Sequence, residues 1–303
     1  HHYVLRCFSK WKVKKIVTLF NPDIIHTNTS VNPIGYEIAK SLGIPHIWHI
    51  REYIDKDFNM HPFPSFRLLR KKIAKSYTIT ISKDLECHFQ LDSSKNRIIY
   101  NGIRNVKEQT KNLPKENYFL YVGRLSEGKG LKELLQAFSR FCQVESNHKL
   151  YIAGSGMDGY VAKIKDYIVR NSMENRVELL GQRKDIDHLM SKAKALIVPS
   201  VSEGFGRISA EAMFNKCLVI GNNTAGTKEQ FDNGLKICGQ EIGIRYNGTE
   251  ELLETLQYVA CKSSENFDDL IECAYRTVQF LYTPEKCANE INDYYQYVLS
   301  SSK

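Results

Sequence analysis

The 303-residue sequence lacks several features that would fix its class at once. No run approaches the roughly 18 apolar residues of a membrane-spanning helix, and the first residues hold no apolar stretch of signal-peptide type. The eight cysteines form no Cys-x-x-Cys pair and do not cluster with histidine. The pattern therefore argues against a membrane span, a disulfide framework and a zinc site. We expect most cysteines to be buried apolar side chains in a reducing cytoplasm.

The composition is that of an ordinary globular chain, with 42% hydrophobic and 25% charged residues, and its length allows two domains. The net charge is +8, carried partly by residues 10–15 and 67–75. Such segments form either a solvated basic face or a surface attracted to anionic lipid head groups or phosphorylated ligands. Nucleic acid is not an expected partner, because the sequence contains no recognised nucleic-acid-binding module.

From about residue 117 onward, short apolar runs end in glycine or polar turns, and each is followed by a helical pattern. Alternating strands and helices of this length predict a doubly wound parallel sheet. The loops after parallel strands open at one edge of such a sheet, where ligands bind. The predicted strands are residues 117–122, 148–153, 177–180, 195–198 and 218–220, and the helices 131–141, 160–169, 186–193, 208–214 and a short one near Thr227.

The first third of the chain follows the same pattern less regularly, and a polar stretch at 107–116 reads as a linker. We therefore predict two Rossmann-like α/β domains facing each other across a cleft. The strands expected in the first domain are residues 23–26, 44–49, 77–81 and 97–100, with a helix at 33–42.

The loop after the first strand of the second domain carries two cations. Arg124 lies at the strand end and Lys129 lies at the start of the next helix. This pattern suits a diphosphate, because arginine can bind two oxygens at once and lysine adds a point charge. Taken alone, an exposed basic loop with a helix-starting glycine explains it equally well.

A second loop, Glu203-Gly-Phe-Gly-Arg-Ile-Ser-Ala-Glu211, follows the strand at 195–198. Gly204 and Gly206 lie where the helix should begin, and a helix start offers unpaired N–H groups and a positive dipole end to an anion. Glu203 and Glu211 are a little over two helical turns apart, so they face roughly the same way. Two such helix starts in one crevice favour the phosphate interpretation.

These motifs together resemble the ordered signature of retaining glycosyltransferases of family 4, which have the two-domain GT-B fold. The resemblance runs from about Asp23 to the end of the chain, and it rests on motifs that are each weak alone. They are Gly123-Arg-Leu with Lys129-Gly130, Gly154-Ser-Gly156, Leu180-Gly181, and Pro199-Ser200 with Glu203-Gly-Phe-Gly206 and Glu211-Ala-Met213.

The resemblance implies roles for the site residues. Arg124 and Lys129 would hold the donor's diphosphate, Glu203 the sugar hydroxyls, and Glu211 the ribose hydroxyls. His49 falls where the family often keeps a histidine that reaches the sugar and the reaction centre. Gln182 and Arg183 would lie near the nucleobase, and Gly204, Phe205 and Gly206 would present backbone to the sugar and phosphate. Gly154 and Arg207 complete the expected donor-binding residues.

An alternative for His49 is a satisfied core histidine at a strand end, since His26 and His46 stand in similar positions. The resemblance also implies an acceptor-side domain at 1–106, a donor-binding domain at 107–281 and a final helix at 282–303 crossing back to the first domain. Two departures stand out. The family's first strand and glycine-rich loop should lie before His1, so we expect an incomplete first domain. The segment Asn215-Lys-Cys-Leu218 lacks the family's glycine and proline.

The expected function is retaining, metal-independent transfer of a sugar from a nucleoside diphosphate sugar to a hydroxyl of a glycan or lipid-linked acceptor, in surface polysaccharide biosynthesis. We expect no cofactor, and a cytoplasmic location that is either free or peripheral on the inner face of the membrane. The alternatives are a non-catalytic nucleotide-sugar-binding remnant, a GT-B epimerase or a phosphorylase, although no motif for a lysine-bound pyridoxal is present. An NAD-dependent dehydrogenase fits less well, because no acidic residue closes a later strand about 20 residues after Gly154–Gly159.

Overall fold

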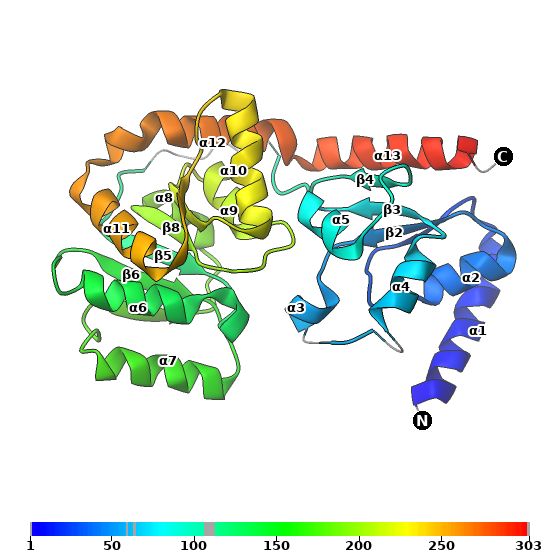
Figure 1. The fold of residues 1–303 in the computed structure, drawn as a ribbon, viewed down its shortest axis with the longest axis horizontal. Coiled ribbons are helices and arrows are strands. Elements are labelled where there is room, and N and C mark those ends of the chain that lie inside the picture. Colours follow the sequence, from blue (N-terminus) through cyan, green and yellow to red (C-terminus); the bar gives the residue numbers. More distant parts are fainter. Residues whose placement is uncertain (1, 59, 63–64, 106–112, 302–303) are drawn as a thin grey trace. The chain divides into compact units, whose positions relative to one another are not determined.

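The computed structural model describes residues 2–58, 60–62, 65–105 and 113–301 (Figure 1). The chain divides into two compact units, which we call unit 1 (residues 1–100 and 286–303) and unit 2 (residues 101–285). Each unit contains its own parallel β-sheet with helices packed around it. The predicted α/β fold with two parallel-sheet domains is therefore confirmed. Most of the predicted linker lies outside the described residues.

Unit 1 contains a four-stranded parallel sheet in the order β1-β2-β3-β4. All four predicted strands are present, with ends shifted by at most two residues. A long first helix was not predicted, because its apolar and basic residues follow no clear helical spacing. The strands are β1 (Ile25–Thr27), β2 (His46–Ile50), β3 (Tyr77–Thr80) and β4 (Asn96–Ile98), and the helices α1 (His2–Phe20), α2 (Ile34–Leu42), α3 (Ile54–Phe58), α4 (Phe66–Ile73) and α5 (Lys83–Phe89).

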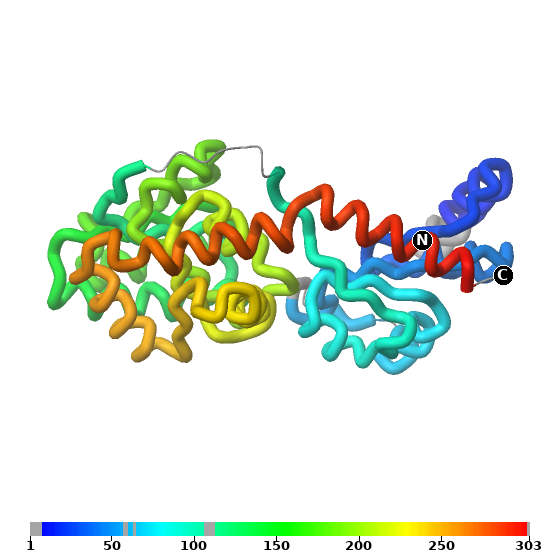
Figure 2. Tube along the Cα trace, turned by 90° about the horizontal axis from the view of Figure 1, so that it is seen from above, coloured from blue at the N-terminus to red at the C-terminus, as the bar shows by residue number. Residues whose placement is uncertain are grey.

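The last helix, α13 (Pro284–Ser301), lies across the sheet of unit 1 (Figure 2). It begins at a proline, which is tolerated in the first helical turn because its missing N–H would have no helical partner there. Tyr294 and Val298 are buried against Ile47 and Ile79 of the sheet. The Tyr294 hydroxyl also donates a hydrogen bond to the Lys95 carbonyl at 2.5 Å. The final helix is thus present where the sequence predicted it, and it completes the core of unit 1.

Unit 2 contains a six-stranded parallel sheet in the order β10-β9-β8-β5-β6-β7. All five strands predicted for this part of the chain are present. The helix expected to be short near Thr227 instead runs for 14 residues. The elements are β5 (Tyr118–Val122), η1 (Glu127–Lys129), α6 (Leu131–Phe141), β6 (Lys149–Ala153), α7 (Asp158–Arg170), β7 (Val177–Gly181), α8 (Ile186–Lys192), β8 (Ala195–Val198), α9 (Arg207–Phe214), β9 (Val219–Asn222), α10 (Ala225–Cys238), β10 (Ile244–Tyr246), α11 (Gly248–Cys261), η2 (Ser264–Phe267) and α12 (Asp268–Leu281).

Helices cover both faces of this sheet, with α6, α7 and α11 on one side and α8, α9, α10 and α12 on the other (Figure 1). The core follows from periodicity, since α6 buries Leu131, Leu134, Leu135 and Phe138 at helical spacing. The strand order reverses between β5 and β8, the first and fourth strands of the unit. In open parallel sheets, ligands bind at the carboxyl ends of strands beside such a reversal. The sheet therefore predicts where a site should form.

In the described part of the chain, no helix combines the length and the apolar character that crossing a membrane requires. The seven described cysteines are all free thiols, but only Cys217 is buried. The prediction that most cysteines are buried was therefore wrong. Several of them lie on partly exposed helix faces, as Cys87 and Cys261 do, so a scattered spacing in the sequence says little about burial.

Candidate functional site

Two loops meet at the strand reversal of unit 2, one after β5 and one after β8. They line a pocket of about 270 Å³ that includes Arg124, Lys129, Glu203 and Gly206. Lys129 Nζ lies 2.7 Å from Glu203 Oε1, and both side chains are about four-fifths buried. The structure therefore brings together four of the predicted site residues from loops 74 positions apart in the chain.

Gly130 allows these two loops to touch. Its φ is +68°, and a Cβ atom there would lie only 2.0 Å from the Pro199 carbonyl oxygen. A residue with a side chain would be both strained and in collision at this position, so only glycine permits the contact. The close approach holds Lys129 beside the loop that carries Glu203.

A second pocket, of about 860 Å³, shares Arg124 with the first. Gly154, Gln182 and Arg183 line it, together with the apolar side chain of Met157. Gln182 Nε2 donates a hydrogen bond to Ser155 Oγ at 2.9 Å. Arg124 belongs to both pockets, so one cation stands between a small charged pocket and a larger one with apolar walls.

The loop from Glu203 to Gly206 is held from below by α9 and α10. Gln230 Nε2 donates to the carbonyl oxygens of Phe205 and Gly206 at 2.7 and 2.9 Å, and Ser209 Oγ donates to Gln230 Oε1 at 2.6 Å. The Gly226 N–H donates to the Glu203 carbonyl at 2.8 Å. Gln230 was not predicted as a supporting residue, because a single glutamine in a helix carries no local signal of such a role.

The pocket is electrostatically suited to an anion. Lys129 is paired with Glu203, and Arg207 Nε lies 2.7 Å from Glu211 Oε1. Among the described residues, Arg124 has no ion-pair partner. The α9 helix begins at Arg207, with Gly206 as its N-cap, so its first N–H groups and its positive dipole end add to these cations.

Not every predicted site residue reaches these pockets. Gly204 and Phe205 do not line either of them, and the Phe205 ring is buried against Tyr282 at a centroid distance of 5.0 Å. Phe205 therefore fixes the position of its loop by packing, and its side chain does not contact the pockets. Glu211 also lies outside the lining and faces the exposed Arg207. His49 belongs to unit 1.

His49 lies in a buried hydrogen-bonded row on the face of the unit 1 sheet that α13 covers. Its Nδ1 is 3.2 Å from His26 Nε2, and His26 Nδ1 is 2.5 Å from the Tyr295 hydroxyl. Arg51 Nε donates to His49 Nε2 at 3.4 Å. Burial, with the charge of Arg51 and the neighbouring His26, lowers the pKa of His49 to about 3. The imidazole is therefore neutral near pH 7, and its Nε2 is an acceptor.

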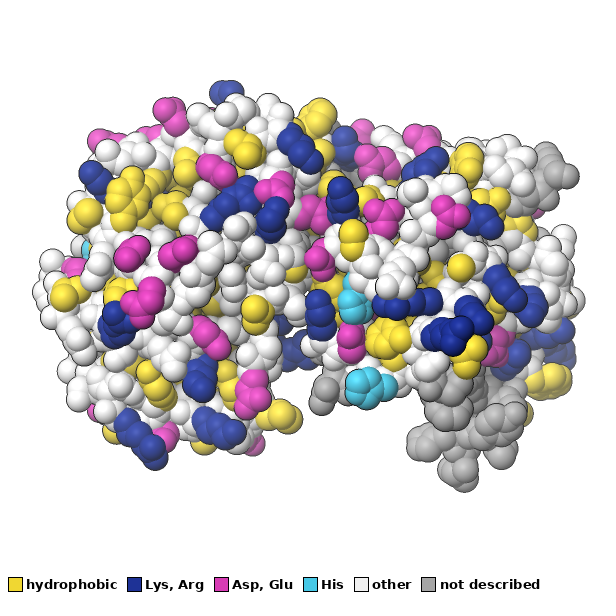
Figure 3. All heavy atoms as spheres, viewed as in Figure 1, with side chains coloured by type: hydrophobic (Ala, Val, Ile, Leu, Met, Phe, Trp, Pro, Cys, Tyr) yellow, Lys and Arg dark blue, Asp and Glu magenta, His cyan; other side chains and the backbone are white. Residues whose placement is uncertain are grey.

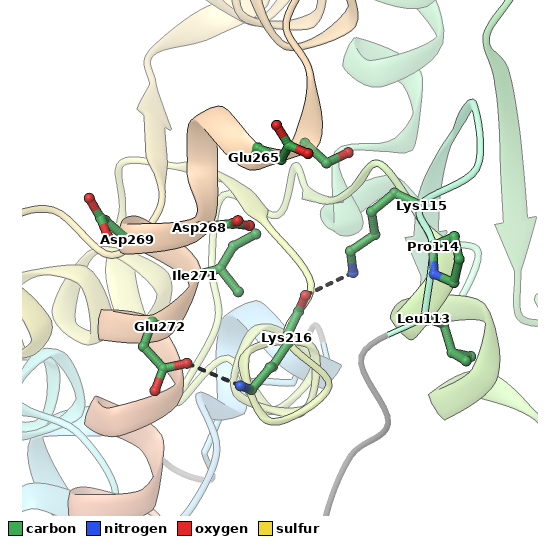
Figure 4. Close-up of a pocket in the computed structure, with 10 residues that line it drawn as sticks. Leu113, Pro114, Lys115, Lys216, Glu265, Asp268, Asp269, Ile271 and Glu272 are labelled. Atoms are coloured by element: carbon green, nitrogen blue, oxygen red, sulfur yellow. Dashed lines mark hydrogen bonds and ion pairs between the residues drawn. The ribbon is translucent and has the colours of Figure 1, made fainter.

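Unit 2 has a further hollow of about 480 Å³ beside α12 (Figure 4). Lys115 Nζ donates there to the carbonyl oxygens of Ser191 and Lys216 at 2.8 Å each. Lys216 Nζ lies 3.0 Å from Glu272 Oε2. Both lysines are thus engaged by this chain, and the remaining charged side chains lining the hollow are acidic, which disfavours an anionic ligand.

The sequence contains two Asp-x-Asp triplets, beginning at Asp55 and at Asp185. Asp185 Oδ2 is 2.6 Å from Arg183 Nη2, and Asp187 Oδ1 is 2.6 Å from Arg104 Nη2. Both aspartates of the second triplet are therefore engaged in ion pairs with arginines. Within the described residues, no group of three or more His, Cys, Asp or Glu side chains is placed to hold a metal ion.

Residues 103–242 match the sequence model of the family described as "Glycosyl transferases group 1". The uncharacterized glycosyltransferase MJ1178 of Methanocaldococcus jannaschii is 29% identical over 231 residues, which cover 71% of this chain and 60% of that protein. The O-antigen chain mannosyltransferase RfbU of Salmonella typhimurium is 29% identical over 177 residues, covering 56% and 49%. The chain thus spans about half to three-fifths of the length of these relatives.

A solved structure of Anabaena HepE in complex with UDP superposes with a TM-score of 0.82. The match covers 95% of this chain and 82% of HepE at 19% sequence identity. At that identity the likeness concerns the fold alone.

Proposed function

We propose that this chain, whose residues 103–242 match the model of the group 1 glycosyltransferases, transfers a sugar from a nucleoside diphosphate sugar to a hydroxyl of a glycan or lipid-linked acceptor. One observation carries the proposal. At the strand reversal of unit 2, Arg124 stands without an ion-pair partner among the described residues, next to the Lys129–Glu203 pair and the start of α9. This arrangement combines groups for a diphosphate with a carboxylate for sugar hydroxyls.

The two pockets divide the donor between them. Arg124, Lys129 and the first N–H groups of α9 hold the diphosphate, and Glu203 accepts hydrogen bonds from the sugar. The nucleobase occupies the larger pocket beside Gln182 and Arg183, with Glu211 turning from Arg207 toward the ribose. As the nucleoside diphosphate leaves, its developing charge is met by cations already in place, so the step needs no metal ion.

The transfer retains the anomeric configuration, as in the retaining family that the motifs resemble. The acceptor hydroxyl attacks from the face that the diphosphate leaves, and a departing phosphate oxygen takes its proton. His49 is held neutral by burial, and it therefore serves as a hydrogen-bond acceptor and not as a proton donor.

A lipid-linked acceptor fits the charge of unit 1. Lys and Arg side chains gather beside apolar ones on the face of unit 1 seen in Figure 3. On α4, Arg67, Leu68 and Lys71 are exposed while Ile73 is buried in the core. Basic side chains around an exposed leucine suit an anionic membrane surface. We therefore place the reaction in the cytoplasm, at the inner face of the membrane.

The test is donor turnover by the purified chain, followed as nucleoside diphosphate release from a panel of nucleotide sugars with candidate glycan and lipid-linked acceptors. Glu203→Ala should lower turnover at least about 100-fold, because transition-state contacts to the sugar are lost, while nucleotide binding stays measurable. Glu272→Ala, which removes a carboxylate from the hollow in Figure 4, is the matched control and should leave turnover unchanged. Unchanged turnover in Glu203→Ala would contradict the proposal.

A further inference from the structure

The ion pair between Lys129 and Glu203 joins a residue that holds phosphate to a residue that holds sugar. The two side chains are 21% and 22% exposed, and their N–O distance is 2.7 Å. Among the described residues, neither has a second ion-pair partner. The Glu203 carboxylate therefore lies within hydrogen-bond distance of Lys129, the cation that binds the sugar-linked phosphate of the donor in the proposed function.

Substrate and product differ at this point. A free nucleoside diphosphate ends in a phosphate that carries between one and two negative charges near pH 7, since its second pKa is about 6. Beside Glu203, this phosphate meets a like charge and competes for Lys129. In a nucleotide sugar the same phosphate is esterified and carries a single charge, and the sugar offers hydroxyl donors to the carboxylate.

The carboxylate cannot withdraw easily from the pocket. Gly226 holds the Glu203 carbonyl, Gln230 holds the two carbonyls that follow Gly204, and Gly130 presses against Pro199 on the facing loop. Such a fixed backbone keeps the negative charge near the phosphate position when the product is bound. At low local dielectric a like charge a few ångströms away is costly.

We propose that the Lys129–Glu203 pair makes the pocket discriminate between the donor and the free nucleoside diphosphate, weakening the binding of the product. The inference rests on the proposed function and adds a second task for Glu203. This residue grips the sugar before transfer and repels the terminal phosphate after it.

The experiment measures dissociation constants by calorimetry for UDP, GDP and ADP, each beside its glucose ester, with wild type and Glu203→Gln. The amide keeps the shape and hydrogen-bonding capacity of the carboxylate but removes its charge. We expect the variant to bind its preferred nucleoside diphosphate about 10-fold more tightly, roughly the value of one charge-assisted contact, without a gain for the sugar ester. The gain should shrink at high ionic strength.

Two further variants serve as controls. Glu272→Gln neutralises the carboxylate of the Lys216 pair outside the pocket and should change neither constant. Lys129→Met breaks the pair from the other side and should weaken both ligands, with no gain for the free diphosphate. If Glu203→Gln binds the diphosphate no better than wild type, the inference fails while the proposed function stands. If no nucleotide binds to wild type or to any variant, both fail.

Discussion

The strand ends of the two units carry opposite kinds of chemistry. In unit 2 the groups at the sheet edge are charged and partly exposed, as Lys129, Glu203 and Arg207 are. In unit 1 the corresponding groups include the histidines His26 and His49, the second of which is only 2% exposed. The same parallel-sheet architecture therefore supports a charged edge that suits phosphates in unit 2 and, in unit 1, buried neutral imidazoles that exchange hydrogen bonds beside the exposed Arg51.

Burial decides which kind of edge forms. Burial is the largest cause of the lowered pKa of His26, His46 and His49, and for His46 it brings the value to about 4. His46 is satisfied by neutral partners, since its Nε2 is 2.7 Å from Thr27 Oγ1 and its Nδ1 is 3.0 Å from Ser76 Oγ. A buried group with neutral partners stays neutral, whereas Lys129 and Arg207 of unit 2 lie beside carboxylates.

The largest effect that we expect to distinguish the two units is a loss of stability of unit 1 in acid. Because these three histidines have a lower pKa in the folded unit than the ordinary 6.5, the unfolded chain binds more protons below that pH. The free energy of unfolding should therefore fall as pH drops from about 6.5 toward 4, by up to roughly 3 kcal/mol per pH unit from His46 and His49, with a further loss from His26. Urea unfolding at pH 7 and pH 5 measures it.

The two units can be followed separately in that experiment. Both tryptophans lie in unit 1, and Trp48 is fully buried with its ring 5.2 Å from that of His46. In a Trp11→Phe variant, fluorescence reports on Trp48 alone. In unit 2, burial raises the pKa of Asp232, but Lys228 and Arg245 outweigh burial, so the pKa is lowered overall. The contribution of Asp232 to the stability of unit 2 is therefore lost only below about pH 4. Equal stability of unit 1 at pH 7 and pH 5 would contradict the account.

A smaller effect is expected from a backbone substitution that disturbs the charged edge of unit 2 without removing any charged side chain. The φ of Gly154 is +147°, and a Cβ atom would lie 1.8 Å from the Gly123 carbonyl oxygen. Gly154→Ala should therefore displace the loop that carries Arg124, destabilise unit 2 by about 3 kcal/mol and weaken nucleotide binding. Thermal unfolding followed by circular dichroism, beside nucleotide titration, measures both effects.

The matched control is Gly159→Ala in α7, where an added Cβ meets nothing within 4 Å. Alanine is the better helix former, so this variant should be as stable as wild type or up to about 1 kcal/mol more stable. If Gly154→Ala behaved in the same way, the loops would not be constrained as the structure describes.

The sequence predicted the architecture well, because parallel strands buried on both faces are short apolar runs with clear glycine or polar ends. It also predicted that Arg124 and Glu203 lie at the same sheet edge, since strand ends converge in this fold. The ion pair of Lys129 with Glu203 could not be predicted. It depends on the packing of Gly130 against Pro199, a contact between residues far apart in the chain.

Other features escaped for related reasons. The support from Gln230 comes through side-chain bonds to carbonyls 24 and 25 positions earlier, which leave no periodic trace. Asn215, expected only to replace a glycine-containing segment, bonds Arg104 and Asp187 and so ties the start of unit 2 to α8. Such polar contacts depend on tertiary geometry, which composition and spacing do not encode.

The central claim is that the charged edge of unit 2 binds a nucleoside diphosphate. Calorimetric titration of the purified chain with UDP, GDP, ADP and CMP, beside an Arg124→Ala/Glu211→Ala double variant, tests it most directly. The account predicts that one of the diphosphates binds clearly better than the others, and that the double variant loses at least about 100-fold in affinity, as expected for two charge-assisted contacts. Absence of binding to all four nucleotides, or equal binding by the variant, would contradict it.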